Sequence, residues 1–181
     1  RILYNTQFSN RIATSTGDPA RAVDGLVSVA RLLDDPRLAR VYTHTLRAGP
    51  VTVDELVAEL DLPRTTAYAD TGTLVDLGLL DRDDSQKTHR FTAEPIHLTA
   101  TLDGDTYTVT PTLVAAAGHT TTDDDLQLLV ERHGLGTLAA ALTYAVPYAD
   151  GRLSERVAAR ELDVQVAFGI AALQALRSLL A

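Results

Sequence analysis

Residues 52–84 predict two short helices, a tight turn between them and a strand directly afterwards. Thr52 and Glu55 form a capping box: the Thr52 hydroxyl accepts a hydrogen bond from the Glu55 amide, and the Glu55 carboxylate accepts one from the Thr52 amide. A helix over about 53–61 follows this cap, and Leu62-Pro63 predicts the turn into a second helix over about 64–77. The sequence therefore predicts a closely joined pair of helices followed by β structure.

The second helix of this pair is predicted to have an apolar side and a polar side. Its buried stripe is expected to hold Ala67, Thr71, Leu74 and Leu77. Tyr68 could donate to an anion or lie in the core, and we favour partial burial for its ring. The side chains expected to point outward are Arg64, Thr65, Thr66, Ala69, Asp70 and Thr73.

Two β-hairpins are predicted after Gly78, which is a natural left-handed helix stop. LLDRDD and THRFTAE can pair across the polar loop DDSQK, and IHLTATL and TYTVT can pair around Asp103-Gly104-Asp105. We expect a small antiparallel sheet of three or four strands, ended by Pro111, which opens a short helix.

Two further helices are predicted before residue 52. Asp18-Pro19 and Asp35-Pro36 each offer an N-cap followed by proline at the first helical position. The helix over about 19–33 is expected to bury Ala22, Leu26, Ala30 and Leu33. The helix over about 36–48 is expected to bury Leu38, Val41, Tyr42 and Leu46 before Gly49-Pro50 ends it.

Helical patterns return from Asp123 onward, over about 123–133, 135–147, 152–163 and 165–180, with Gly134 and Asp150-Gly151 as separators. The carboxylates of residues 123–125 fit a first helical turn, where they complement the helix dipole. The last helix is apolar nearly all round, which predicts burial in a core or against a partner chain.

A weak internal repeat relates the two halves of the chain. Residues 59–62, EL-D-L, match EL-D-V at residues 161–164, and hydrophobic positions after them stay in register. The C-terminal half is thus a candidate for a second helix pair, although two short helices with similar spacing also coincide by chance. Its outward surface would comprise Gln165, Val166, Ala167, Gly169 and Ala172, which favours packing or dimerisation over phosphate contact.

The charge of the chain is strongly acidic, with a formal net charge of -8 over 181 residues. Lys87 is the one lysine, and Asp outnumbers Glu by eighteen to six. Such a surface resembles that of proteins from extremely halophilic archaea; a GC-rich genome is the alternative explanation and leaves the Asp excess unexplained. The Debye length is about 3 Å at 1 M salt, so at such salt net negative charge does not exclude binding to a polyanion.

Residues 36–92 resemble the winged helix-turn-helix domain of bacterial and archaeal transcription regulators. The matching elements are T-V-D-E-L-V-A-E-L, the turn D-L-P-R-T-T-A-Y, the tail L-V-D-L-G-L-L and the charged hairpin that follows. The resemblance implies that the second helix enters the major groove and the hairpin contacts the backbone or the minor groove. The residues expected to contact DNA are Arg64, Thr65, Thr66, Tyr68, Thr73, Arg82, Lys87, His89 and Arg90.

No arrangement of residues in the sequence predicts catalysis or cofactor binding. The histidines lack metal-ligand spacing, the chain has no cysteine, and LDGDT departs from the calcium-loop pattern. Phosphate-binding glycine loops and G-x-S-x-G signatures are missing. The N-terminus is polar, and no stretch is long and apolar enough to span a membrane, so a cytoplasmic protein is expected.

Taken together, the patterns predict a mainly α protein with a small antiparallel β-sheet (α+β). Residues 1–110 would form the winged helix-turn-helix domain with its N-terminal helix, and residues 111–181 a helical dimerisation or sensing domain. The expected function is sequence-specific binding of double-stranded DNA by a homodimeric regulator at high salt, with a small-molecule effector possible but unnamed. The alternative is a winged-helix interaction module for another protein, without specific DNA binding.

Overall fold

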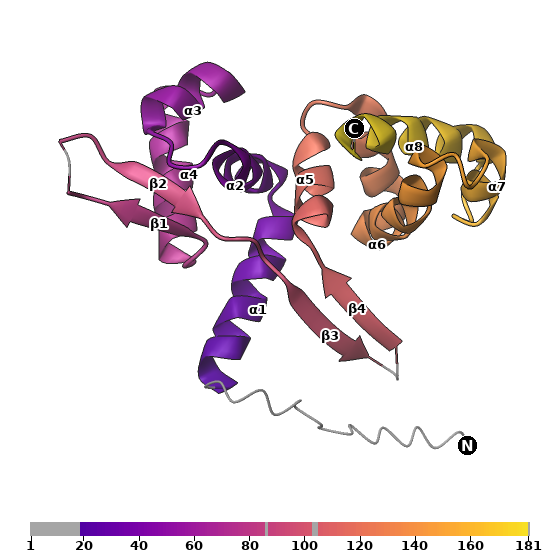
Figure 1. Ribbon diagram of the computed structural model, residues 1–181, viewed down its shortest axis with the longest axis horizontal. Helices are drawn as coiled ribbons and strands as arrows, with labels where there is room; N and C mark the ends of the chain where they lie inside the picture. The colour runs from indigo at the N-terminus through magenta and orange to yellow at the C-terminus, as the bar shows by residue number, and fades with distance from the viewer. Residues whose placement is uncertain (1–18, 86, 103–104, 181) are drawn as a thin grey trace.

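The computed structural model describes residues 19–85, 87–102 and 105–180 (Figure 1). The expected N-cap Asp18 and the expected turn residues Asp103 and Gly104 lie outside the described residues. The elements in chain order are α1 (Pro19–Asp34), α2 (Pro36–Ala48), α3 (Val53–Leu60), α4 (Arg64–Asp76), β1 (Leu80–Asp83), β2 (Arg90–Ala93), β3 (Leu98–Leu102), β4 (Asp105–Val109), α5 (Pro111–His119), α6 (Asp124–Ala149), α7 (Glu155–Arg160) and α8 (Val166–Leu180). The mainly helical fold with a small antiparallel β part is confirmed.

Side-chain caps define where several helices begin. Asp35 accepts from the amides of Arg37 and Leu38 at 3.0 and 3.3 Å and starts α2. The Thr52–Glu55 capping box is present, with both reciprocal bonds formed at the start of α3. Asp123 accepts from the Leu126 amide at 3.0 Å and starts α6. These signals placed helix starts correctly because a cap is a local arrangement of neighbouring residues.

The β structure differs from the predicted single sheet, because it consists of two separate two-stranded sheets, β1-β2 and β3-β4. The segment between β2 and β3 leaves the ladder at Pro95, which has no amide hydrogen to donate. The buried Tyr42 hydroxyl of α2 donates to the Glu94 carbonyl and accepts from the Ile96 amide. The Tyr42 hydroxyl thus forms the hydrogen bonds that the backbone of a continuous strand would have formed with a neighbouring strand.

The buried side of α1 also differs from the prediction. Val29 and Leu32 are buried, whereas Leu26 is 47% exposed and Ala30 is exposed. The C-terminal half of α1, from Ser28 onward, packs against the helices of the N-terminal unit. There the Ser28 hydroxyl donates to the Leu77 carbonyl, just after α4, at 2.8 Å. Figure 1 shows the rest of α1 extending away from the other helices. A helical repeat predicts a stripe, but it does not predict how far along the helix its neighbour reaches.

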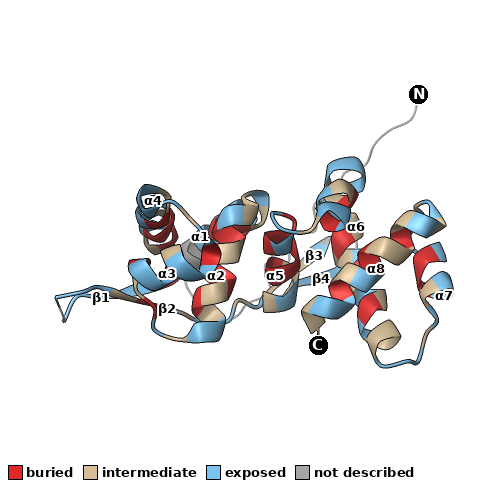
Figure 2. Ribbon diagram, turned by 90° about the horizontal axis from the view of Figure 1, so that it is seen from above, coloured by how far each residue is buried: buried red, intermediate tan, exposed pale blue. Residues whose placement is uncertain are grey.

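The helix α5 lies between α2 and the C-terminal helices (Figure 1). Its closest approach to α2 is at Gly118, where a Cβ atom would lie 2.9 Å from the Arg40 amide nitrogen. Val114, Ala116 and Ala117 are fully buried on this helix (Figure 2). Small residues therefore allow the backbones of α2 and α5 to meet closely.

The C-terminal helices follow the predicted order with shifted bounds. The helix α6 runs through the two predicted helices, but Gly134 interrupts it with a φ of 82°. The helix α7 is shorter than the predicted 152–163, because the chain turns at Ser154 and again at Glu161. As expected for its apolar sequence, α8 buries one face against α6 and α7, where a Cβ at Gly169 would lie 3.0 Å from the Ala159 Cβ.

The segment from α6 to α8 repeats the local geometry of α2 to α4, 102 residues further along the chain. Asp61 and Asp163 are both left-handed, with φ of 51° and 52°, and each sits between the two helices of its pair. Thr52 and Ser154 occupy the matching N-cap positions. The matched pairs that are buried in both units are Leu56 and Ala158, Leu60 and Leu162, Ala67 and Gly169, Asp70 and Ala172, Thr71 and Leu173, and Leu74 and Leu176.

This correspondence supports the second helix pair that the internal repeat predicted. It also corrects the predicted outward surface of that pair. Gly169 and Ala172 are buried, and only Gln165 and Ala167 of the predicted set are fully exposed, with Val166 half-buried.

Candidate nucleic-acid interface

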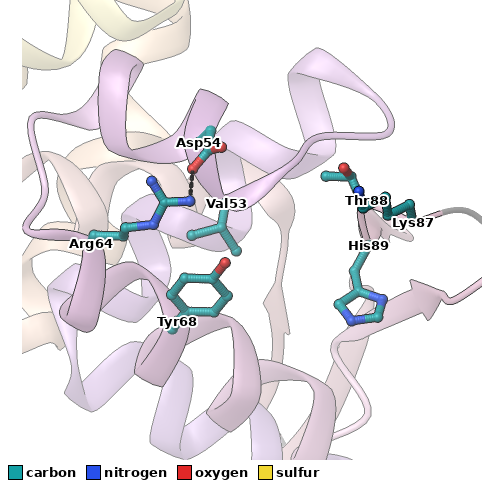
Figure 3. Close-up of a pocket in the computed structure, with 7 residues that line it drawn as sticks. All are labelled: Val53, Asp54, Arg64, Tyr68, Lys87, Thr88 and His89. Atoms are coloured by element: carbon teal, nitrogen blue, oxygen red, sulfur yellow. Dashed lines mark ion pairs between the residues drawn. The ribbon is translucent and has the colours of Figure 1, made fainter.

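The N-terminal half of α4 and the β1–β2 hairpin, called the wing below, border one solvent-facing groove. The groove has a volume of about 330 Å³. Figure 3 shows Arg64 and Tyr68 of α4 on one side and the wing residues on the other. The lining residues are Val53, Asp54, Arg64, Tyr68, Lys87, Thr88 and His89. The structure thus brings together four of the predicted contact residues: Arg64, Tyr68, Lys87 and His89.

Arg64 lies at the first position of α4 and is fixed by two neighbours. One of its terminal nitrogens lies 2.7 Å from an oxygen of the Asp54 carboxylate, and its guanidinium carbon lies 5.9 Å from the centre of the Tyr68 ring. Tyr68 and Asp54 both raise the pKa of Arg64, so the guanidinium stays charged. The side chains of Arg64 and Asp54 are each 62% exposed, so the pair is open to competition from solvent ions.

Tyr68 is more exposed than expected. The residue is 53% exposed, because it lies against Arg64 on the outer side of α4. Thr65 is also exposed and Thr66 is half-buried, so both remain on the accessible side as predicted. Leu77, predicted to be buried, is half-buried because α4 ends at Asp76.

Asp70 does not point outward, which corrects the prediction from helical spacing. Its carboxylate is 4% exposed and accepts from the Arg37 Nε at 2.8 Å. This bond and the charge of Asp70 raise the pKa of Arg37. Thr73 lies beside this ion pair, away from the wing, and its hydroxyl donates to the Ala69 carbonyl at 2.9 Å. The pair joins α2 to α4, and no local pattern predicts it, because its partners are 33 residues apart in the chain.

The predicted wing cations have different environments. Arg82 Nε and His89 Nδ1 each lie 2.8 Å from the same Asp84 oxygen. Arg90 donates to the Pro50 carbonyl at 3.1 Å, which connects β2 to the loop before α3. Lys87 is exposed, and no acidic side chain among the described residues forms an ion pair with it. Two aspartates missed in the prediction of the site, Asp54 and Asp84, therefore pair with Arg64 and Arg82.

The described residues contain neither a metal-binding cluster nor a membrane-spanning helix. Within residues 19–85, 87–102 and 105–180, no three His, Asp or Glu side chains are grouped as a metal site would require. None of the helices described is both long enough and apolar enough to pass through a membrane.

Comparison with known proteins gives two partial matches. Residues 45–84, which cover the end of α2, both helices of the pair and β1, match the IclR helix-turn-helix domain. Residues 120–181, which cover α6 to α8, match a family of unknown function (DUF7437). Searches of curated proteins and of solved structures gave no match. The first match covers the α3 and α4 side of the groove and ends before Lys87, Thr88 and His89, and it indicates a DNA-binding transcription regulator of the helix-turn-helix class.

Proposed function

We propose that this protein is a sequence-specific transcription regulator that binds double-stranded DNA at high salt. In this proposal α4 enters the major groove, and the wing contacts the backbone or the adjacent minor groove. The observation that carries the proposal is the shared groove of Arg64, Tyr68, Lys87 and His89. A helix N-terminus with its cation and a nearby wing lysine can contact neighbouring phosphates of the DNA backbone.

The residues proposed to bind DNA are the predicted set without Thr73. Arg64, Thr65, Tyr68, Lys87 and His89 make the principal contacts, and Thr66, Arg82 and Arg90 lie near enough along α4 and the wing to add phosphate contacts. Thr73 is removed from the contact set because it lies beside the Arg37–Asp70 ion pair.

The acidic partners of these cations support binding in concentrated electrolyte. The contacts of Arg64 with Asp54, and of Arg82 and His89 with Asp84, must break before these side chains can contact phosphate. Screening at molar salt weakens exposed ion pairs and the repulsion between a chain of net charge -8 and DNA. We infer an archaeal cytoplasm rich in salt as the working environment.

The test is a fluorescence-anisotropy titration with chromosomal DNA fragments in molar KCl. Arg64→Ala with Lys87→Ala is expected to weaken specific binding at least about tenfold. Arg156→Ala with Arg160→Ala on α7 removes the same charge far from the groove and should leave binding unchanged. The regulator hypothesis fails if no fragment is preferred and the groove variant binds like the control. The alternative, a winged helix that docks another protein, would then be favoured, since aspartates already pair with Arg64 and Arg82.

We infer that the regulator is a homodimer, since a twofold axis matches a palindromic operator. The support is an exposed apolar stripe on α1, with Val23 59%, Leu26 47% and Val27 57% accessible. Light scattering of the Leu26→Asp, Val27→Asp variant should then report a monomer, and an unchanged mass would locate the interface elsewhere.

For domain organisation we propose residues 1–110 as the DNA-binding unit, which also carries the α1 dimer surface, and residues 111–181 as a helical unit that senses a ligand or adds a second dimer contact. The close contact of α5 with both α2 and α6 supports a rigid connection between these units.

A further inference from the structure

A second cavity lies between α2, the end of α3 and α5, away from the groove described above. Its volume is about 250 Å³, and its walls include Arg40, Thr43, His44, Arg47, Leu60 and His119. Arg40, His44 and Arg47 follow one another at intervals of four and three residues, so they share one side of α2. His119 faces them from the last turn of α5.

The two arginines of this cavity have no ion-pair partner within the described residues. Neither Arg40 nor Arg47 forms an ion pair there, whereas Arg37, Arg64 and Arg82 each pair with an aspartate. Burial and the charges of Arg47 and Arg40 lower the pKa of His119, while Asp123 opposes this change. In a chain of net charge -8, two unpaired guanidinium groups on one cavity are a marked local excess of positive charge.

The Thr43 hydroxyl adds a second, independent observation. The residue is 8% exposed, and its Oγ1 atom has no hydrogen-bond partner. The buried threonines Thr45 and Thr71 each donate to the carbonyl four residues earlier, at 2.9 and 2.8 Å. An unsatisfied buried hydroxyl is unfavourable, so its retention at the wall of a cationic cavity points to a ligand atom that accepts its hydrogen.

The size of the cavity limits the ligand. A volume of about 250 Å³ lies below the range of about 300–1,000 Å³ typical of drug-sized ligand sites. Leu60 and Ala115 supply apolar walls, and the close approach of Gly118 to Arg40 limits expansion between α2 and α5. A phosphate, a sulfate or a short carboxylate fits this space.

We propose that the α2–α5 cavity binds a small free oxyanion, with Arg40 and Arg47 as its counter-charges and the Thr43 hydroxyl as a donor. Guanidinium groups suit such ligands because their planar donors match the oxygens of phosphate and carboxylate. The site goes beyond the proposed DNA binding and does not depend on it. It lies where the DNA-binding helices meet the C-terminal helices, so its occupant would bridge the two units.

The experiment uses the full chain, without DNA, and inorganic phosphate as the probe. Thermal unfolding is followed as sodium phosphate replaces sodium chloride at constant ionic strength. We expect a saturable rise of about 3–5 °C in the unfolding temperature. Arg40→Gln with Arg47→Gln should abolish the rise, and Arg156→Gln with Arg160→Gln on α7 should retain it.

Thr43→Val separates binding from folding, because it removes the unpaired hydroxyl while nearly keeping the side-chain shape. This variant should unfold at the same or a higher temperature without phosphate, and calorimetry should show phosphate affinity about tenfold weaker. A rise no larger in phosphate than in chloride, or equal rises in both arginine variants, would overturn the proposal. Stabilisation by duplex DNA that is lost in the Arg40→Gln, Arg47→Gln variant, without stabilisation by free phosphate, would also overturn it, since these arginines would then contact the DNA backbone.

Discussion

The Arg64 guanidinium and the Asp54 carboxylate, 2.7 Å apart, join the first turn of α4 to the first turn of α3 at the border of the groove. Asp54→Asn is expected to raise DNA affinity about 2–5-fold at low salt, because an exposed ion pair no longer competes with phosphate. Anisotropy titrations at low and molar KCl check this, and the gain should shrink in molar KCl. Asp76→Asn, which removes an exposed charge at the far end of α4, is the control; an equal gain there would contradict a local effect.

Asp84 holds both Arg82 and His89 in the wing. Asp84→Asn should free Arg82 to contact phosphate, so the log–log dependence of DNA affinity on salt should steepen by roughly 1. The slope is measured from binding constants over a KCl series. The neighbouring exposed Asp81 provides the control Asp81→Asn, and indistinguishable slopes for the two variants would mean that Asp84 does not restrain the wing.

The buried Asp70 depends on Arg37 for its charge partner. Arg37→Ala should lower the free energy of unfolding by about 2–3 kcal/mol, because it leaves a buried carboxylate without compensation. Urea unfolding measures the loss, with Arg156→Ala as a control of the same charge change at an exposed site. A loss below about 0.5 kcal/mol would mean that water reaches Asp70.

The Tyr42 hydroxyl serves the Glu94 carbonyl and the Ile96 amide between the two sheets. Tyr42→Phe should cost about 1–2 kcal/mol of stability, since both backbone groups lose their partner while the ring still packs. Hydrogen exchange at the Ile96 amide should accelerate more than exchange within α2. Uniform acceleration across both segments would show global destabilisation instead of local release.

The pKa of His119 is lowered by burial, with Arg47 and Arg40 acting in the same direction. Without a ligand, its contribution to stability is present above the unfolded pKa of about 6.5 and is lost as the pH falls through the folded pKa. A bound anion favours the charged imidazole, so sulfate, whose charge is constant here, should bind more tightly as the pH falls. Calorimetry between about pH 7.5 and 5.5 tests this, and His119→Gln should flatten the trend.

Local signals in the sequence predicted much of the fold. The caps at Asp35, Thr52 and Asp123 and the break at Gly134 depend on neighbouring residues, so helix starts and separations could be derived without tertiary information. The prediction of the buried residues of α1 was wrong because their burial depends on where α2 lies. The single sheet failed because Tyr42, distant in sequence, takes the backbone groups of the connecting segment.

The candidate interface was predictable in part for the same reason. Helical spacing and the hairpin signal placed Arg64, Tyr68, Lys87 and His89 on adjoining elements, and the structure brings them to one groove. Spacing alone could not identify Asp54 and Asp84 as their partners, or show that Asp70 turns inward to Arg37. Long-range pairings between polar side chains leave no periodic trace in the chain.

The second three-helix unit carries Ala172 at the position that corresponds to Asp70. The same arrangement of helices can thus pack around the methyl group of Ala172 where the first unit buries the carboxylate of Asp70. Charge at that position is dispensable for architecture as long as acid and base are lost together. If two apolar residues replaced Arg37 and Asp70, the orientation of α4 relative to α2 would depend on side-chain packing alone, without an ion pair.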